Sequence, residues 1–161
     1  GFHHCRFYVG NARQASSFYI TRYGFSPYAY DGLETGNREF ATYAVKNGKV
    51  ILAFTTAYNN ETEEQKDFHR RINAHGDGVK DMYFNIDNVE NAFKVASERG
   101  AKVIEEVTTI TDKNGKGHIV RCGFECYKDT NVYLIESYKT LINKKRHKEK
   151  IDVPLYFRKW F

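Results

Sequence analysis

The sequence is poor in cysteine, and it has no long apolar stretch. Its three cysteines, Cys5, Cys122 and Cys126, are too few and too unevenly paired for a secreted disulfide framework. Cys122 and Cys126 also have no second pair of ligands at zinc-site spacing. No apolar run reaches the roughly 18 residues that a transmembrane helix needs. We therefore expect a cytoplasmic protein with no membrane partner.

The beginning of the chain lacks the basic and apolar pattern of a signal peptide, and it lacks an initial methionine. These features predict a fragment or a processed chain. The composition, with two prolines, 41% hydrophobic and 16% aromatic residues, excludes collagen-like, coiled-coil and disordered chains. A length of 161 residues corresponds to one domain or to two small half-domain modules.

The net charge of +5 is concentrated at the end of the chain. Residues 138–161 hold eight of the 25 Lys and Arg residues and two of the 20 acids, so the rest of the chain is close to neutral. The basic run 144–150 is interpreted as a solvated connector, although it has the charge to touch RNA or acidic lipid. The segment 151–161 is too apolar to be left in solvent, so it should dock on the body or on a partner. A neutral body makes a nucleic-acid partner an unfavoured interpretation.

The first third of the chain reads as a strand, a helix and three further strands. Alternation predicts a strand over 2–9, and Asn11 and Gly24 are typical of the beginning and end of a helix. The three strands that follow are predicted at residues 25–30, 39–46 and 49–56.

The same order returns later in the chain. A strand is predicted over 79–86, and a helix between Asp87 as its N-cap and Gly100. Further strand signals follow at residues 102–107, 109–110, 118–124 and 130–136, with a turn at 112–117. Between the repeats, the polar segment 58–78 has a short helix predicted near 61–72.

Two tandem βαβββ modules predict an α+β protein with the vicinal oxygen chelate (glyoxalase/dioxygenase-like) fold, in which two curled sheets form a half-open barrel. We expect one such domain over 1–138, with modules at about 2–57 and 79–137, the polar connector 58–78 and a basic, aromatic tail over 139–161. This fold hosts several chemistries and also metal-free binding proteins, so the repeat alone does not define the function.

Five segments, in order along the chain, resemble the N-terminal domain of eukaryotic 4-hydroxyphenylpyruvate dioxygenases. They are FYVGNARQASSFY (7–19), GLETGNRE (32–39), HGDGVKD (75–81), ERGAKV (98–103) and DKNGK (112–116). The resemblance extends over nearly the whole body of the chain, to about residue 138. From about residue 143 onward, the sequence differs from the linker between the two domains of that family.

This resemblance implies an iron(II)-dependent oxidoreductase of tyrosine and phenylalanine catabolism. Such an enzyme converts 4-hydroxyphenylpyruvate and O2 to homogentisate and CO2 in the cytoplasm. The resemblance also implies that the iron ligands and the substrate pocket lie in a C-terminal catalytic domain beyond this chain. A chain that corresponds to the N-terminal half is therefore expected to be inactive alone, with no catalytic or cofactor-binding residues of its own.

A metal site within this chain is the less favoured alternative. Aligned on the fold, the ligand positions hold His4, Asp81 and Glu136. One histidine and two carboxylates differ from the usual iron triad of two histidines and one carboxylate. In the competing interpretation, Arg6 pairs with Asp81 or Glu136 and keeps cations away. We also expect Arg6, Asp81 and Asn85 to line the space between the two modules.

The remaining histidines and Cys5 have structural interpretations. His3 should be a packed strand residue on the face opposite His4, and Cys5 a small buried hydrophobe. His75 lies in a His-Gly-Asp-Gly turn that requires positive φ. His69 and His118 have no partner that the sequence identifies.

Three hypotheses follow. The chain is the N-terminal, non-catalytic half of a 4-hydroxyphenylpyruvate dioxygenase, a stand-alone metal-free binding or assembly subunit, or a small metalloenzyme that uses His4, Asp81 and Glu136. Its 24 Tyr and Phe residues exceed what a core of this size can bury, so we expect a homodimer or a larger assembly.

Overall fold

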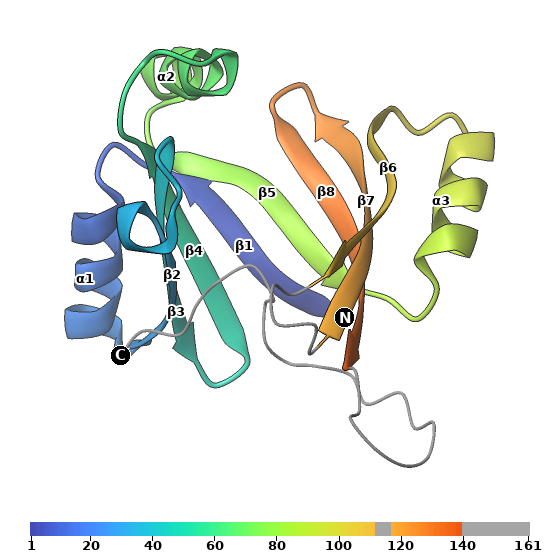
Figure 1. Ribbon diagram of the computed structural model, residues 1–161, viewed down its shortest axis with the longest axis horizontal. Helices are drawn as coiled ribbons and strands as arrows, with labels where there is room; N and C mark the ends of the chain where they lie inside the picture. Colours follow the sequence, from blue (N-terminus) through green and yellow to red (C-terminus); the bar gives the residue numbers. More distant parts are fainter. Residues whose placement is uncertain (112–116, 140–161) are drawn as a thin grey trace. The chain divides into compact units, whose positions relative to one another are not determined.

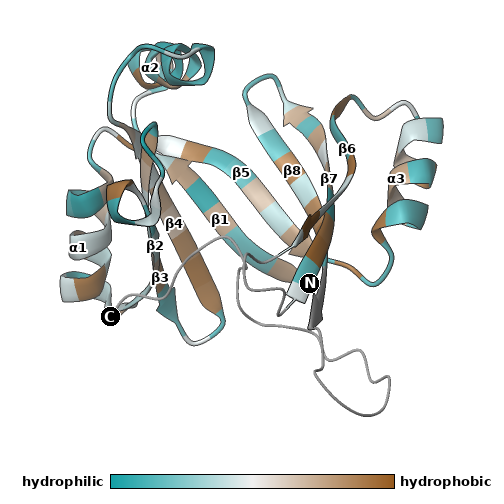
Figure 2. Ribbon diagram, viewed as in Figure 1, coloured by the Kyte–Doolittle hydropathy of each residue, from teal (hydrophilic) through white to brown (hydrophobic). Residues whose placement is uncertain are grey.

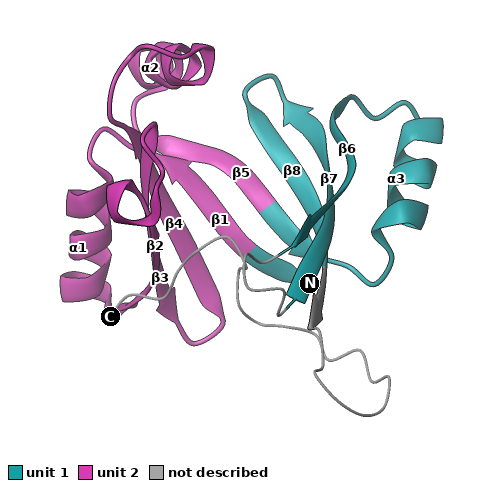
Figure 3. Ribbon diagram, in the orientation of Figure 1, with its two compact units in different colours: residues 1–3, 83–156 teal, residues 4–82, 157–161 magenta. Residues whose placement is uncertain are grey.

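The computed structural model describes residues 1–111 and 117–139, with side chains as far as residue 136. These residues form two compact units, one of residues 4–82 and the other of residues 1–3 together with the chain from residue 83 (Figure 3). The predicted turn beyond residue 111, the basic run 144–150 and the segment 151–161 lie outside the described residues.

The chain follows the predicted β-α-β-β-β order twice, which confirms the fold class (Figure 1). The elements are β1 (Phe2–Tyr8), α1 (Ala12–Tyr23), β2 (Ser26–Asp31), the one-turn helix η1 (Leu33–Thr35), β3 (Phe40–Asn47), β4 (Val50–Ala57), α2 (Glu63–His75), β5 (Gly78–Asn85), α3 (Val89–Glu98), β6 (Val103–Thr111), β7 (Gly117–Tyr127) and β8 (Thr130–Lys139). No described helix has the length and apolar character that crossing a membrane would require.

In the unit of residues 4–82, the strands lie in the order β2-β3-β4-β1-β5. β3 is antiparallel to both β2 and β4, whereas β1 is parallel to β4 with Arg6 opposite Ala53. A parallel pair needs a crossover connection, and α1 provides part of it. α1 packs on one face of this sheet, where Val9, Ala12, Val45 and Phe54 form the buried core.

In the other unit, β6, β7 and β8 form an antiparallel meander. α3 covers one face of the meander, where Val89, Cys122 and Phe124 form the buried core. Leu134 of β8 packs against the same cluster, which shows that the even-numbered positions of β8 near this point face the helix.

The helix caps confirm the sequence signals in α1 and correct them in α3. The side chain of Asn11 accepts a hydrogen bond from the Gln14 N–H at 2.9 Å, and Gly24 ends α1 with φ of 69°. In α3, however, the N-cap is Asn88 and not Asp87, because the Asn88 side chain accepts from the Asn91 N–H at 2.8 Å. β5 ends at Asn85, one residue before the predicted end of this strand, although the Ile86 N–H still donates to the Ile135 carbonyl of β8 at 3.0 Å.

The connector between the repeats is more than a polar linker. Its helix, α2, is capped by Thr62 in a capping box with Gln65 and runs about three residues past its predicted end (Figure 2 shows it as mostly hydrophilic). Its buried anchor is Phe68, whose ring centroid lies 4.9 Å from that of Tyr8 and 6.1 Å from that of Phe40. Gln65 is equally buried, and its side-chain amide donates to the Glu39 carbonyl at 3.0 Å, so Phe68 and Gln65 together dock α2 on the face that also carries Arg6.

Candidate functional site

The unit of residues 4–82 presents a polar sheet face opposite α1. Alternation along β1 sends Phe7 toward α1, where it packs with the helix core, and sends Arg6 and Tyr8 to the opposite face. Tyr8 is buried beneath Phe68 of α2, and this burial raises the pKa of its hydroxyl. The face is therefore built by strand alternation and partly closed by the connector helix.

An ion pair between Arg6 and Asp81 dominates this face. The Asp81 Oδ2 atom accepts a hydrogen bond from Arg6 Nε at 2.5 Å and pairs with Nη2 of the same guanidinium. The side chain of Asp81 is 0% exposed, whereas that of Arg6 is 30% exposed. The guanidinium carbon lies 5.5 Å from the ring centroid of Tyr8, so a cation–π contact supports the pair. The predicted pairing of Arg6 with Asp81 is confirmed.

The second unit carries a comparable arrangement on the face opposite α3. Arg121 Nε donates to Glu105 Oε1 at 2.5 Å, and the guanidinium carbon lies 5.4 Å from the ring centroid of Tyr133. Tyr133 stacks on Tyr83 with a centroid distance of 4.8 Å and an interplanar angle of 10°. These residues were not among the site residues predicted from the sequence. Their signal was the alternation of β7, in which Arg121 stands between Val120 and Cys122 of the helix-facing core.

The three candidate metal ligands have different positions. His4 is buried and belongs by alternation to the face of Arg6, and Asp81 is bound by Arg6 itself. Glu136 belongs to the other unit and accepts a hydrogen bond from the Val89 N–H at 3.2 Å. It therefore lies on the α3-facing side of β8, where a carboxylate stabilises the positive end of a helix dipole.

These residues do not fit an iron centre. An iron triad needs two imidazoles and a carboxylate whose lone pairs are available to the metal. Asp81 instead receives two guanidinium nitrogens, whose positive charge opposes a cation at the same oxygen. Among residues 1–111 and 117–136, no group of three His, Cys, Asp or Glu side chains is arranged to hold a metal ion.

Asn85 makes backbone contacts with Gly1 within its own unit. Its carbonyl accepts from the terminal amine of Gly1 at 2.5 Å, and its N–H donates to the Gly1 carbonyl at 2.6 Å. That Asn85 lines a space between the modules together with Arg6 and Asp81 stays a prediction.

The remaining histidines have structural positions. His3 is buried, as predicted. The ring of His69 lies within hydrogen-bonding distance of the Asn59 carbonyl, with Nε2 at 3.1 Å, which supplies the partner that the sequence did not identify. His75 ends α2, and the following Gly76 has φ of 71°, which confirms the glycine turn. His118 lies near the beginning of β7.

Two of the three cysteines are inert by burial. Burial raises the pKa of the Cys5 thiol to about 11, and the nearby carboxylate of Asp81 acts in the same direction. Burial also raises the pKa of Cys122 to about 11, with a further contribution from Glu105. A thiol with so high a pKa is a poor nucleophile at neutral pH, which agrees with the structural interpretation of Cys5.

Residues 1–136 match the family model described as "Glyoxalase/Bleomycin resistance protein/Dioxygenase superfamily", and the chain belongs to this superfamily. Within it, the chain is similar to curated proteins named 4-hydroxyphenylpyruvate dioxygenase. It is 45% identical over 136 residues to that of Yarrowia lipolytica and 42% identical over 135 residues to that of Danio rerio. Each match covers 84% of this chain, and the chain spans about a third of each relative's length, 34% and 33% respectively. The resemblance seen in the sequence is confirmed.

Solved structures with the same fold include a mutant of 4-hydroxymandelate synthase from Streptomyces coelicolor. That structure has a TM-score of 0.68 and 23% identity, and the match covers 86% of this chain and 41% of the other. Another is methylmalonyl-CoA epimerase from Mycobacterium tuberculosis, with a TM-score of 0.60 and 12% identity over 84% of this chain and 87% of the other. At these identities the likeness establishes the fold alone.

Proposed function

We propose that this chain is the N-terminal, non-catalytic half of a 4-hydroxyphenylpyruvate dioxygenase. The observation that carries the proposal is the match at 45% identity over 136 residues, which accounts for only about a third of the relative's length. The whole enzyme would convert 4-hydroxyphenylpyruvate and O2 to homogentisate and CO2, as a cytoplasmic step of tyrosine catabolism. Iron(II) would be bound by the C-terminal domain.

In each unit, the side chains on the sheet face opposite the helix support a non-catalytic role. A catalytic iron domain leaves carboxylates and imidazoles available for the metal and the keto acid, whereas here the carboxylates of Asp81 and Glu105 are bound by arginines. Such ion pairs between strands fix the position of the strands on each face. The chain would therefore act as a folded scaffold for the catalytic half and for assembly.

A chimeric enzyme tests this proposal. Residues 1–136 would replace the matching 136-residue segment of the Yarrowia lipolytica relative, with its remaining sequence unchanged. We expect a folded chimera that produces homogentisate in the presence of iron(II) and ascorbate. A chimera that folds and binds iron(II) but has no turnover would contradict the proposal.

The isolated 161-residue chain provides the matched control. With iron(II), ascorbate and 4-hydroxyphenylpyruvate, we expect O2 uptake no higher than in the iron-only blank. Turnover that disappears in a His4→Ala variant would instead favour the small metalloenzyme that uses His4, Asp81 and Glu136.

Exposed aromatic residues on α1 favour an additional role in assembly. The side chains of Phe18 and Tyr23 are 52% and 59% exposed, and their rings contact each other with centroids 5.6 Å apart. An exposed aromatic pair loses unfavourable contact with water when a partner covers it. We expect sedimentation to show a homodimer or a larger complex. In a Phe18→Ser/Tyr23→Ser variant, this complex should be weaker and should dissociate at protein concentrations at which the unsubstituted complex stays intact.

The second candidate function is a stand-alone binding subunit. The intact mass of the natural protein distinguishes it from a longer dioxygenase.

A further inference from the structure

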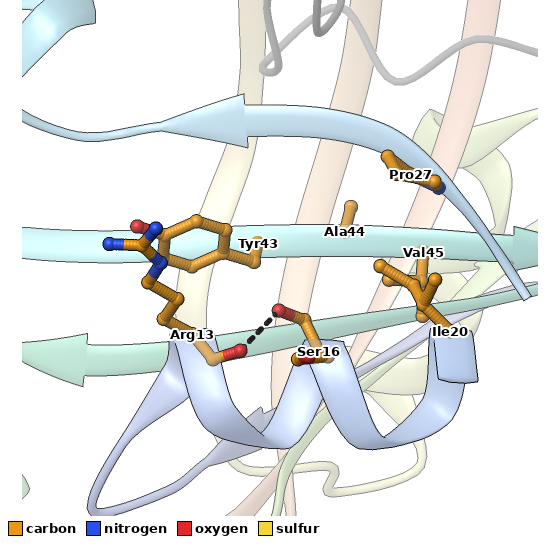
Figure 4. Close-up of a pocket in the computed structure, with 8 residues that line it drawn as sticks. Arg13, Ser16, Ile20, Pro27, Tyr43, Ala44 and Val45 are labelled. Carbon is orange, nitrogen blue, oxygen red and sulfur yellow. Dashed lines mark hydrogen bonds between the residues drawn. The ribbon is translucent and has the colours of Figure 1, made fainter. Parts of the chain in front are cut away.

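A small pocket lies between α1 and the β2–β3 edge of the unit of residues 4–82, away from the Arg6–Asp81 pair (Figure 4). Its volume is about 190 Å³. α1 supplies Arg13, Ser17 and Ile20 to its wall, β2 supplies Pro27, and β3 supplies Tyr43 and Val45. The proposed dioxygenase role does not use this pocket, although Arg13 and Ser17 belong to the segment 7–19 that resembles the dioxygenase family.

The pocket has a polar end and an apolar end. In Figure 4 the guanidinium of Arg13 lies at the same end as the hydroxyl of Tyr43, and Ile20, Pro27 and Val45 lie at the opposite end. The nearby Ser16 hydroxyl donates to the Arg13 carbonyl at 2.9 Å, which fixes the helical turn that carries the arginine. The pocket therefore combines a hydrogen-bonding end with a hydrophobic body.

Arg13 is the only charged group among the residues that line the pocket. Its side chain is exposed, and it forms no ion pair with any carboxylate in residues 1–111 and 117–136. In contrast, Arg6 and Arg121 of the same chain each bind a carboxylate. A guanidinium presents two parallel donors that match a carboxylate, so Arg13 is available for an anion that comes from outside the chain.

We propose that this pocket binds a small aromatic monocarboxylate, with the carboxylate on Arg13 and the ring against Ile20 and Pro27. The size supports one ring, because an apolar cavity of about 150 Å³ in another protein holds benzene. The two ends of the pocket match the two parts of such a ligand, since mostly apolar pockets use a few polar groups to orient their ligands. This site goes beyond the proposed function and does not depend on it.

Nuclear magnetic resonance titration of the 161-residue chain with phenylacetate tests the site. We expect saturable shifts of the backbone amides of Ser17, Ile20 and Ala44, with a dissociation constant of about 0.1–10 mM, as for a ligand of this size. The neutral analogue phenylacetamide and the ring-free acetate should each bind at least about tenfold more weakly, because each lacks one of the two contacts.

Two arginine variants of the same helix separate a specific site from general charge attraction. Arg13→Met should weaken phenylacetate binding about tenfold. Arg22→Met, which removes the same charge outside the pocket lining, should leave it unchanged. Equal binding by Arg13→Met and the unsubstituted chain, shifts that map elsewhere, or the absence of saturable shifts would each overturn the proposal. Activity of the chimeric dioxygenase is a separate measurement and would be unaffected by these outcomes.

Discussion

The two units place the same three kinds of side chain on the sheet face opposite their helix, but they bury them to different depths. Arg6, Tyr8 and Asp81 in one unit correspond to Arg121, Tyr133 and Glu105 in the other. Asp81 is fully buried, whereas the side chains of Arg121 and Glu105 are 23% and 22% exposed. A buried carboxylate depends on its partner far more than a partly hydrated one. We therefore expect the loss of the arginine to lower the free energy of unfolding more in the unit of Asp81 than in the unit of Glu105.

The largest effect is expected from removing the guanidinium of the buried pair. Arg6→Met keeps the apolar stem but takes away the charge that Asp81 Oδ2 binds, and we expect a loss of about 3 kcal/mol in the free energy of unfolding. Urea unfolding measures this change. The double variant Arg6→Met/Asp81→Leu should recover most of the loss, because it no longer buries a carboxylate without its arginine. A loss of the same size in the double variant would show that the deep burial of Asp81 is not the cause.

A smaller effect is expected from the stacked tyrosines of the other unit. Gly123 lies opposite Tyr133 in the β7–β8 register, and a Cβ atom at this position would meet the Tyr133 ring at 2.7 Å. Gly123→Ala should displace that ring from Tyr83 and Arg121, at a cost of about 1–3 kcal/mol.

Near-ultraviolet circular dichroism would report the loss of the fixed Tyr83–Tyr133 stack, and urea unfolding the loss of stability. Gly36→Ala is not a suitable control, since Gly36 has φ of 94° and its substitution is strained by the backbone alone. Gly78→Ala is the better control, because no atom lies within 4 Å of its added Cβ and its φ is not positive. Equal effects of Gly123→Ala and Gly78→Ala would contradict the steric explanation.

The partly exposed ion pair should contribute less than either of these. Arg121→Met removes the partner of Glu105, and we expect a loss of about 0.5–1 kcal/mol, because water solvates the remaining carboxylate. The loss should shrink further in about 1 M salt, which screens exposed charges. The loss from Arg6→Met should persist under the same conditions. A comparison of the two variants at low and high salt thus tests the difference in burial directly.

Much of this fold could be predicted from the sequence because its signals are local. The cap at Asn11, the positive φ of Gly24 and the repeated β-α-β-β-β order follow from the nearest neighbours in the chain. The pairing of Arg6 was predicted only as far as a choice between Asp81 and Glu136, both placed by aligning the repeats on one fold, and the structure selects Asp81.

The features that were not predicted depend on register and on long-range packing. Glu105 reaches Arg121 across β6 and β7, where the register shifts twice, so no simple spacing relates the two residues. In β8, the apolar residues Val132, Tyr133, Leu134 and Ile135 occupy both faces, so alternation does not indicate that Glu136 faces α3. The docking of α2 depends on Phe68 and Gln65, two buried residues in an otherwise polar segment. Each of these features is a contact between elements, which local patterns do not encode.

The smallest effect on stability at neutral pH is expected from the ionisation of two thiols, one in each unit. Burial raises the pKa of both Cys5 and Cys122 to about 11, from an ordinary value of 9.0. Their second cause differs, being the carboxylate of Asp81 for Cys5 and that of Glu105 for Cys122. Because both pKa values are raised in the folded state, the stability linked to these thiols is complete below about pH 9 and is lost as the pH rises through 11.

Alkylation with iodoacetamide at about pH 8, followed by mass spectrometry, compares the two thiols with the exposed Cys126. We expect Cys126 to be modified first, whereas Cys5 and Cys122 should react only when the chain unfolds, at rates that rise with added urea. In Arg6→Met, Cys5 should become reactive at a lower urea concentration than Cys122, because the variant weakens the unit that holds Cys5. Rapid modification of Cys5 in the native chain would contradict its burial, and parallel labelling of the two thiols in Arg6→Met would indicate that the units unfold together.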